Sequence, residues 1–179
     1  MSNVSTLIGN VLKGVPELNR TIDGEKFYTI VVEFKSVVIP VLISEYICAD
    51  RVFEDKISVT GCLMSDVYKK GKLPQFYFYA NSIEAADMDA EVNNLINFSV
   101  TVTKVREFKH NDQCKDILPL VGAAGSPLST TSVLYLCTIN ALARKLKDVP
   151  KGYALKGTGY LKQFRDVYEI YVQNAEILQ

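Results

Sequence analysis

Alternation of apolar and polar positions is the main pattern in this chain, and it predicts a protein built from β-strands. Side chains on a strand point alternately to its two faces, so a period of two marks a half-buried strand. The alternating runs are rich in β-branched and aromatic residues, and glycine or polar clusters separate them. Five runs lie in the first half, at 6–12, 26–34, 36–43, 56–64 and 75–83, and four in the second half, at 96–105, 132–139, 152–161 and 166–177.

Each half also contains one segment with helical character, between its third and fourth strand signals. In segment 139–148, Leu142 and Leu146 are spaced i, i+4 and Pro150 follows as a helix stop. Segment 44–53 has only a partial apolar face, made by Tyr46, Ile47 and Phe53. Both segments are therefore predicted to be short helices.

The two halves match each other in spacing, which indicates an internal repeat. A shift of 96 residues places Ser36–Ile39 on Ser132–Tyr135 and Gly61 on Gly157. Later in the chain the shift becomes 92, as residues 76–84 match residues 168–176. The difference falls at the basic segment Lys69–Lys72, where a hairpin tip tolerates a change of length.

The order of strand, strand, strand, helix, strand, strand is that of the OB-fold, a small five-stranded barrel with a capping helix. We therefore predict an all-β protein with short helices, made of two tandem OB-fold barrels at 1–88 and 94–179. The acidic segment between them is short, so we expect the barrels to pack together.

Parts of the chain resemble the bacterial single-stranded DNA-binding protein family. The first copy has a strand with Gly9, a Pro16-Glu17-Leu18 turn, a tip with Gly24 and a returning strand, Phe27–Phe34. The second copy resembles the family's helix, turn and following strand at Lys151-Gly152, Leu155, Gly157 and Leu161. Residues 96–131 match poorly, and segment 121–132 is expected to form a loop. The family's glycine- and glutamine-rich linker and acidic tip have no counterpart here, so no tail function is carried over.

The charge composition excludes a protein that binds duplex DNA through a high net positive charge. Lys plus Arg and Asp plus Glu are both 20, giving a net charge of zero. The charge is unevenly divided, because residues 1–90 carry a net charge of −3 and residues 91–179 a net charge of +3. This division favours the second copy for phosphate contacts, although attraction between barrels or subunits would also explain it.

Ten tyrosines and eight phenylalanines supply rings that could stack unpaired bases. On strand 75–83, Phe76 and Phe78 share a face expected in the core. Tyr77 and Tyr79 share the other face, where they either cap the outside or stack bases. On strand 26–34 the even positions form the core-like face, so Phe27 is a candidate stacking residue, with packing on the partner barrel as the alternative.

Basic residues near the predicted hairpins complete the candidate site. Tyr68 and three lysines occupy the tip between strands four and five, which either contacts nucleic acid or is simply solvated. The basic residues of segment 139–148, Arg144, Lys145 and Lys147, are expected to be solvated. The predicted nucleic-acid-binding residues are Lys13, Arg20, Phe27, Tyr68, Lys69, Lys70, Lys72, Tyr77, Tyr79, Lys104, Arg106, Phe108 and Lys109.

Neither an enzyme nor a cofactor or metal site is predicted. Four cysteines stand far apart without a CxxC pair, and no phosphate-binding loop, GxSxG or HExxH motif is present. A nucleophile–base pair of Cys114 and His110 is the weak enzymatic alternative. The carboxylates of segment 87–91 have no second cluster beside them to complete a metal site.

These observations predict a cytoplasmic protein that binds single-stranded DNA with little sequence preference, by base stacking and phosphate contacts. No apolar run approaches the length of a membrane helix, and the N-terminus is not a signal peptide. The resemblance implies a role in DNA replication, recombination or repair, with a mobile element or phage as one source. A homodimer is expected from exposed strand edges. RNA is an alternative ligand, and an OB-fold protein-interaction module without nucleic-acid binding is the alternative function.

Overall fold

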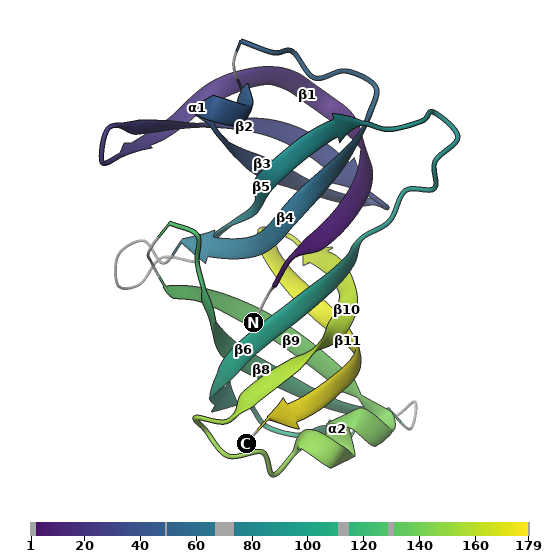
Figure 1. The fold of residues 1–179 in the computed structure, drawn as a ribbon. Coiled ribbons are helices and arrows are strands. Elements are labelled where there is room, and N and C mark those ends of the chain that lie inside the picture. Colours follow the sequence, from purple (N-terminus) through teal and green to yellow (C-terminus); the bar gives the residue numbers. More distant parts are fainter. Residues whose placement is uncertain (1–2, 49, 67–73, 111–114, 129–130, 179) are drawn as a thin grey trace. The chain divides into compact units, whose positions relative to one another are not determined.

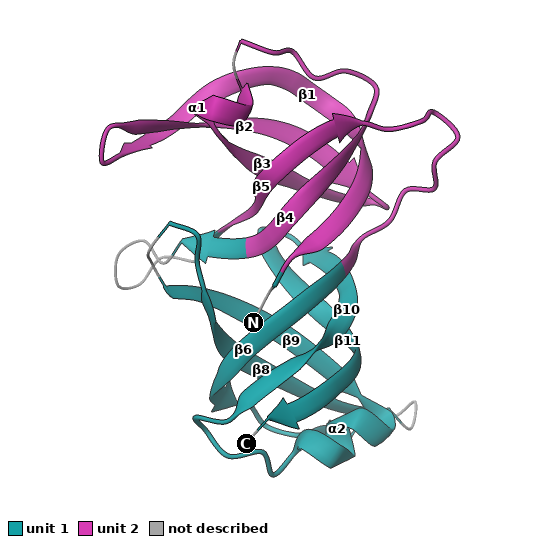
Figure 2. Cartoon of the chain, viewed as in Figure 1, with its two compact units in different colours: residues 1–3, 64–75, 96–179 teal, residues 4–63, 76–95 magenta. Residues whose placement is uncertain are grey.

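The computed structural model describes residues 3–48, 50–66, 74–110, 115–128 and 131–178 (Figure 1). The described chain forms two compact units (Figure 2). In chain order, the first unit has residues 4–63 and 76–95 (magenta), and the second unit has residues 1–3, 64–75 and 96–179 (teal). The predicted domains, 1–88 and 94–179, follow the order of the strands along the chain. The compact units differ from these domains because segment Met64–Gln75 groups with the second unit.

The first barrel closes on itself in the strand order β1-β2-β3-β5-β4. Strands β1 and β2, β2 and β3, and β1 and β4 pair in antiparallel fashion, whereas β3 and β5 pair in parallel. The barrel's elements are β1 (Ser5–Ile22), β2 (Glu25–Phe34), β3 (Val37–Ser44), α1 (Glu45–Cys48), β4 (Lys56–Asp66) and β5 (Gln75–Ala85).

The second barrel repeats this topology. Its sheet has the order β6-β10-β11-β9-β8-β7, and pairing of β6 with β8 closes it. The pair β9 and β11 is parallel, as β3 and β5 are. The elements are β6 (Leu95–Val105), β7 (Lys109–His110), β8 (Asp116–Gly125), β9 (Thr131–Ile139), α2 (Asn140–Leu146), β10 (Ala154–Phe164) and β11 (Val167–Leu178). The predicted tandem OB-fold architecture is therefore confirmed.

Alternating side chains fill both barrels, as the pattern predicts. In the first barrel Phe34 and Phe78 are fully buried, with ring centroids 6.0 Å apart, and Phe76 is buried as well. In the second barrel Leu136 and Ile170 are fully buried on neighbouring strands. Full burial of one such side chain stabilises the fold by about 1.5–3 kcal/mol.

The first helix is shorter than predicted, because the following segment binds to β1 instead of continuing the helix. The Phe53 amide donates to the Gly14 carbonyl and the Val11 amide to the Asp55 carbonyl. Asp50 and Asp55 adopt positive φ angles, which a helix does not allow. Tyr46, predicted to lie on the apolar face, is 80% exposed.

The segment predicted as a loop at 121–132 is largely strand, since β8 continues to Gly125. One of its small residues, Gly122, is needed where β6 and β8 approach each other to close the barrel. A Cβ atom added at Gly122 would lie 2.5 Å from the Cβ of Val100. Glycine and alanine have low β-propensity, so the sequence pattern did not indicate a strand here.

The repeat is real, but its register in one strand differs from the predicted one. Val41 pairs with Phe78 in the first barrel, and Leu136 pairs with Ile170 in the second. Residues in β3 and β9 are therefore related by a shift of 95 rather than 96, while the shift of 92 fits β5 and β11. A one-residue slip moves every side chain to the opposite face. At the observed shift Tyr135 corresponds to the half-buried Pro40 and not to the fully buried Ile39, in agreement with its place outside the barrel.

The segment between the barrels is tied to the first one. The Lys56 ammonium donates hydrogen bonds to the carbonyls of Met88 and Ala90, and the Asn93 amide donates to the Ile8 carbonyl. A lysine of β4 thus holds the backbone of segment 87–91. Within the second unit, the Ser65 hydroxyl donates to the Val133 carbonyl at 2.6 Å. No helix in the described residues is long and apolar enough to cross a membrane.

Candidate nucleic-acid interface

Two rows of side chains cross the outer wall of the second barrel, each following residues that pair directly from strand to strand. We name the rows after Tyr135 and Tyr171 and give their members in the strand order β10, β11, β9, β8, β6. Corresponding members of the two rows are two residues apart in the sequence. The Tyr135 row is Lys162, Glu169, Tyr135, Val121 and Lys104; the Tyr171 row is Tyr160, Tyr171, Cys137, Pro119 and Arg106, whose amide donates to the Pro119 carbonyl.

Strand alternation explains why both rows face outward. The residues between them, including Leu120, Leu136 and Leu161, are buried in the core. Lys104, Arg106 and Lys162 are exposed, and Tyr160 is 40% exposed. The wall therefore combines aromatic rings with cationic groups.

Cations lie against two of these rings. The Lys162 ammonium is 3.8 Å from the centroid of the Tyr171 ring, and the Arg106 guanidinium carbon is 6.0 Å from the centroid of the Tyr135 ring. Contacts of this kind contribute about 0.5–2 kcal/mol and hold the cation in a defined place. A positioned cation can contact a phosphate with less loss of conformational entropy.

A cavity of about 350 Å³ opens at one end of this wall. Phe164, the last residue of β10, borders it and is 75% exposed. OB-folds bind ligands on the face of their second and third strands, between the loops after the first and fourth strands. In this barrel those strands are β8 and β9, so the cavity lies at that position. It is lined by Arg106, Pro119, Leu120, Tyr135, Phe164, Val167 and Glu169.

Burial raises the pKa of three titratable groups on the wall, Glu169, Cys137 and Tyr171. Burial raises the pKa of the Glu169 carboxyl, and the nearby Arg106 and Lys162 partly oppose that increase. Burial, with a smaller effect of Glu169, raises the pKa of the Cys137 thiol to about 11. Cys137 is therefore an uncharged thiol at neutral pH.

The loop that carries the predicted basic cluster is anchored by a buried carboxylate. Asp116, at the start of β8, accepts a hydrogen bond from Arg144 and contacts the Nδ1 atom of His110, both at 2.7 Å. Its amide lies 3.3 Å from the Asn140 side-chain oxygen. Arg144, predicted to be solvated, therefore has a structural partner. His110 is paired with Asp116. Cys114, its partner in the enzymatic alternative, lies outside the described residues.

The predicted residues of the second barrel run from the end of β6 to the short strand β7. Lys104 and Arg106 belong to the two rows, and Lys109 is exposed on the short strand β7. Phe108, between β6 and β7, is 37% exposed. Sequence reasoning missed Tyr135, Tyr160, Lys162, Phe164 and Tyr171, although their places on alternating strands were a signal for an outward orientation.

The aromatic candidates of the first barrel are less accessible. Phe27 and Tyr77 are 3% and 6% exposed, so neither offers an open ring face to a base. The Phe27 ring lies 6.4 Å from the half-buried ring of Tyr79, and the Arg20 guanidinium lies 4.9 Å from the Tyr77 ring. These rings pack against protein groups.

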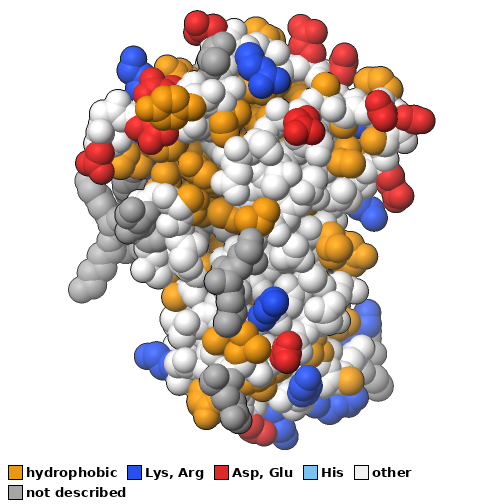
Figure 3. Space-filling view, viewed as in Figure 1, with side chains coloured by type: hydrophobic (Ala, Val, Ile, Leu, Met, Phe, Trp, Pro, Cys, Tyr) orange, Lys and Arg blue, Asp and Glu red, His pale blue; other side chains and the backbone are white. Residues whose placement is uncertain are grey.

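The remaining first-barrel candidates do not form a cluster among the described residues. Lys13 forms an ion pair with Glu17 at 2.6 Å. Tyr68, Lys69, Lys70 and Lys72 lie outside the described residues. The space-filling view shows acidic side chains mainly over the first barrel and basic ones mainly over the second, on the face that is drawn (Figure 3). This agrees with the charge division in the sequence.

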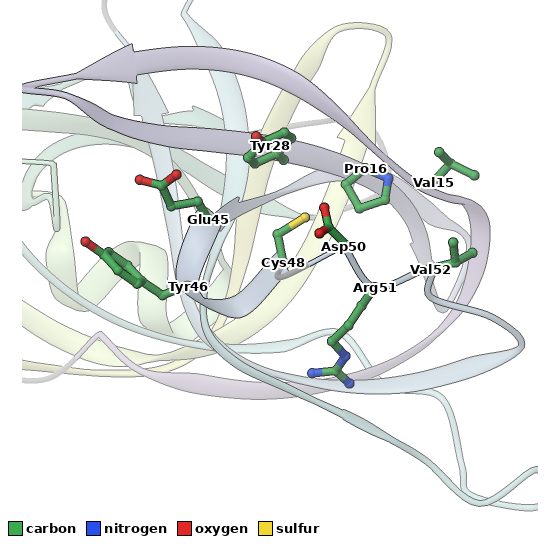
Figure 4. A pocket seen from close by; sticks show the side chains of 9 residues that line it. All are labelled: Val15, Pro16, Tyr28, Glu45, Tyr46, Cys48, Asp50, Arg51 and Val52. Atoms are coloured by element: carbon green, nitrogen blue, oxygen red, sulfur yellow. The ribbon is translucent and has the colours of Figure 1, made fainter.

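A second pocket, of about 570 Å³, lies in the first unit (Figure 4). Val15 and Pro16 border it from β1, and Tyr28 borders it from β2. The Arg51 side chain points away from the Tyr28 ring. The other lining residues are Glu45, Tyr46, Cys48, Asp50 and Val52. No group of three or more potential metal-binding side chains occurs in the part of the chain that the structure describes.

The fold and the outer wall together define a tandem OB-fold protein. Comparison with solved structures finds the single-stranded DNA-binding protein of Thermus aquaticus. A deletion variant matches with a TM-score of 0.77 at 17% identity, covering 99% of this chain and 95% of that chain. The wild-type protein matches with a TM-score of 0.75 at 16% identity, covering 99% and 93%. The resemblance predicted from sequence is thereby confirmed for the fold. No family model matches the sequence, and no curated protein does.

Proposed function

We propose that this protein binds single-stranded DNA without catalysis, on the outer wall of its second barrel. The observation that carries the proposal is the pair of outer rows, which place the Tyr135 ring beside Arg106 and the Tyr171 ring beside Lys162. Stacking on an aromatic ring contributes about 1–3 kcal/mol per base and tolerates any sequence. The likeness of the fold to the Thermus aquaticus single-stranded DNA-binding protein supports the proposal of single-stranded DNA binding.

The individual side chains have different roles in this proposal. Tyr135 and Phe164 stack bases, because their rings border the cavity. Lys162 and Lys104 contact phosphates from the two ends of the Tyr135 row, and Lys109 extends the cationic surface along the adjacent loop. We further propose that the protein acts in DNA replication, recombination or repair in the cytoplasm, with a mobile element or phage as one source.

A fluorescence-anisotropy titration with labelled oligo-dT at low salt tests this function. We expect binding in the micromolar range or tighter, and a linear fall of log affinity with log salt of about −0.7 for each phosphate contacted. An oligo-rU of the same length tests RNA as the alternative ligand. Absence of binding to either oligonucleotide, by protein with the circular dichroism of a folded β-protein, would contradict the proposal.

We also propose that the protein self-associates through β1. Strand edges, the reason expected from the sequence, do not drive this association, because both barrels close. Leu12, Val15 and Leu18 on β1 are instead exposed by 56%, 59% and 60%. Sedimentation equilibrium of the wild type and Leu18→Glu tests the proposal. The variant should be monomeric while the wild type is a dimer, and a monomeric wild type would contradict it.

The pocket of the first unit favours the alternative function, a protein-interaction module. Its rim combines exposed Tyr46 and Val52 with the carboxyl groups of Glu45 and Asp50. This chemistry suits a peptide with a basic residue beside an apolar one. Titration with a labelled Arg-Leu repeat peptide, using Glu45→Gln as the variant, tests this function. Equal binding by both proteins would exclude the pocket as the site.

A further inference from the structure

We propose that the cavity on the second barrel takes one guanine base, and that Glu169 makes it guanine-selective. The inference rests on the proposed function, because it assigns a base to the same wall. Glu169 and Arg106 are the two charged residues that line the cavity. A carboxylate repels phosphates, so Glu169 would weaken binding of the backbone. It can instead accept hydrogen bonds from a base.

Glu169 is placed to meet the edge of a stacked base. It pairs directly with Tyr135 on β9 and with Lys162 on β10. A base lying on the Tyr135 ring would therefore present its edge toward the neighbouring carboxylate. Within the described residues, the Glu169 carboxylate makes no hydrogen bond and no ion pair within 4.0 Å. Both oxygens are available as acceptors.

The chemistry of the base edges selects guanine. On its Watson–Crick edge guanine carries two adjacent donors, N1–H and the 2-amino group, beside the 6-oxo acceptor. The two oxygens of a carboxylate can accept both donors, and the guanidinium of Arg106 can donate to the 6-oxo group. Cytosine and adenine offer one donor beside a lone pair that repels a carboxylate. Thymine offers one donor between two carbonyl groups.

Partial desolvation of Glu169 strengthens this recognition. Its pKa is raised mainly by burial, which means that water solvates the carboxylate incompletely. A hydrogen bond to such a group has weaker competition from water than one at an open surface. Bases splayed from a single strand are commonly recognised in this way, stacked on a ring and read along the Watson–Crick edge.

The test compares short oligo-dT strands of about eight nucleotides, within the site size of one OB-fold, that differ in one central base. The central base is dT, dG, dI, dA or dC, and affinity is measured by anisotropy. We expect dG to bind about tenfold more tightly than dT, and dI, which lacks the 2-amino group, to fall between them. In Glu169→Gln the advantage of dG should disappear, while affinity for the all-dT strand stays equal or rises because a negative charge is lost.

Glu176→Gln, an exposed position on the same strand, is the matched control and should keep the dG advantage. Equal affinities of the wild type for dG and dT strands would overturn the guanine assignment while the proposed function stands. A dG advantage that persists in Glu169→Gln would overturn the role of this residue. Failure to bind any strand would instead overturn the proposed function.

Discussion

The ammonium of Lys162 lies 3.8 Å above the centroid of the Tyr171 ring. The two residues belong to neighbouring strands, β10 and β11, and to the two adjacent rows of the outer wall. This cation lies closer to its ring than Arg106 lies to the ring of Tyr135, where the guanidinium carbon is 6.0 Å from the centroid. Under the proposed function, Lys162 on Tyr171 would provide a fixed cation for phosphate, while Tyr135, which borders the cavity, would stack a base.

Replacing Tyr135 by alanine should weaken binding of oligo-dT by about 1–3 kcal/mol, the contribution of one stacked base. Tyr46→Ala is the matched control, because Tyr46 is 80% exposed and belongs to the first barrel. Anisotropy titrations of both variants measure the difference. Equal loss of affinity in both, or in neither, would remove Tyr135 from the site.

Replacing Lys162 by glutamine should lower both the affinity for oligo-dT and its dependence on salt. Loss of one phosphate contact changes the slope of log affinity against log salt by about 0.7. Lys147→Gln, an exposed lysine just after α2, serves as the control for the change in net charge. A slope that stays the same in Lys162→Gln would show that this ammonium does not contact the phosphates.

Replacing Asp116 by asparagine should destabilise the second barrel. The buried carboxylate binds Arg144 and His110 at 2.7 Å each, and hydrogen bonds to charged groups contribute about 1.5–3 kcal/mol. Both partners are largely exposed, so we expect a loss of about 1–3 kcal/mol in the free energy of unfolding by urea. Asp148→Asn, at an exposed position, should have little effect. Similar urea midpoints of unfolding for both variants would contradict the role of Asp116 in anchoring the loop.

Much of this fold, but less of the site, could be predicted from the sequence. Alternation identified nine of the strands, and their order with the two helices identified the OB-fold. Strand β8 was missed because Gly122 and its alanine neighbours carry no β signal, although close approach of Val100 requires a small residue there. Pairing of distant strands is not visible in a local pattern. The parallel contact of β9 with β11, which brings Tyr135 to Glu169, therefore appears only in the structure.

The site also shows how tertiary packing overrides strand alternation. Phe27 lies on the outward-facing side of β2, as the alternation predicts, yet only 3% of it is exposed and its ring packs near Tyr79. Alternation gives the face of a strand but not what covers that face. Tyr135 illustrates the converse, since the flanking Leu134 and Leu136 lie in the core and leave its ring outside.

The raised pKa of Glu169 predicts a pH-dependent contribution to stability. Because the folded protein holds this proton above the ordinary pKa of 4.5, the stabilising contribution is present at acid pH and is lost as the pH rises through the folded pKa. Glu169→Gln should therefore gain stability relative to the wild type at neutral pH, and less or none at about pH 4. Urea unfolding at both pH values measures this difference. A variant that is less stable at neutral pH would contradict the prediction.

The most direct test of the account is to map where an unpaired strand contacts the protein. Oligo-dT carrying a photoreactive 5-bromouracil is cross-linked to the wild-type protein, and the attachment sites are identified by mass spectrometry. The account predicts cross-links at the rings of the second barrel's wall, Tyr135 and Phe164 above all. Cross-links confined to the first barrel, with the second barrel unlabelled, would contradict it.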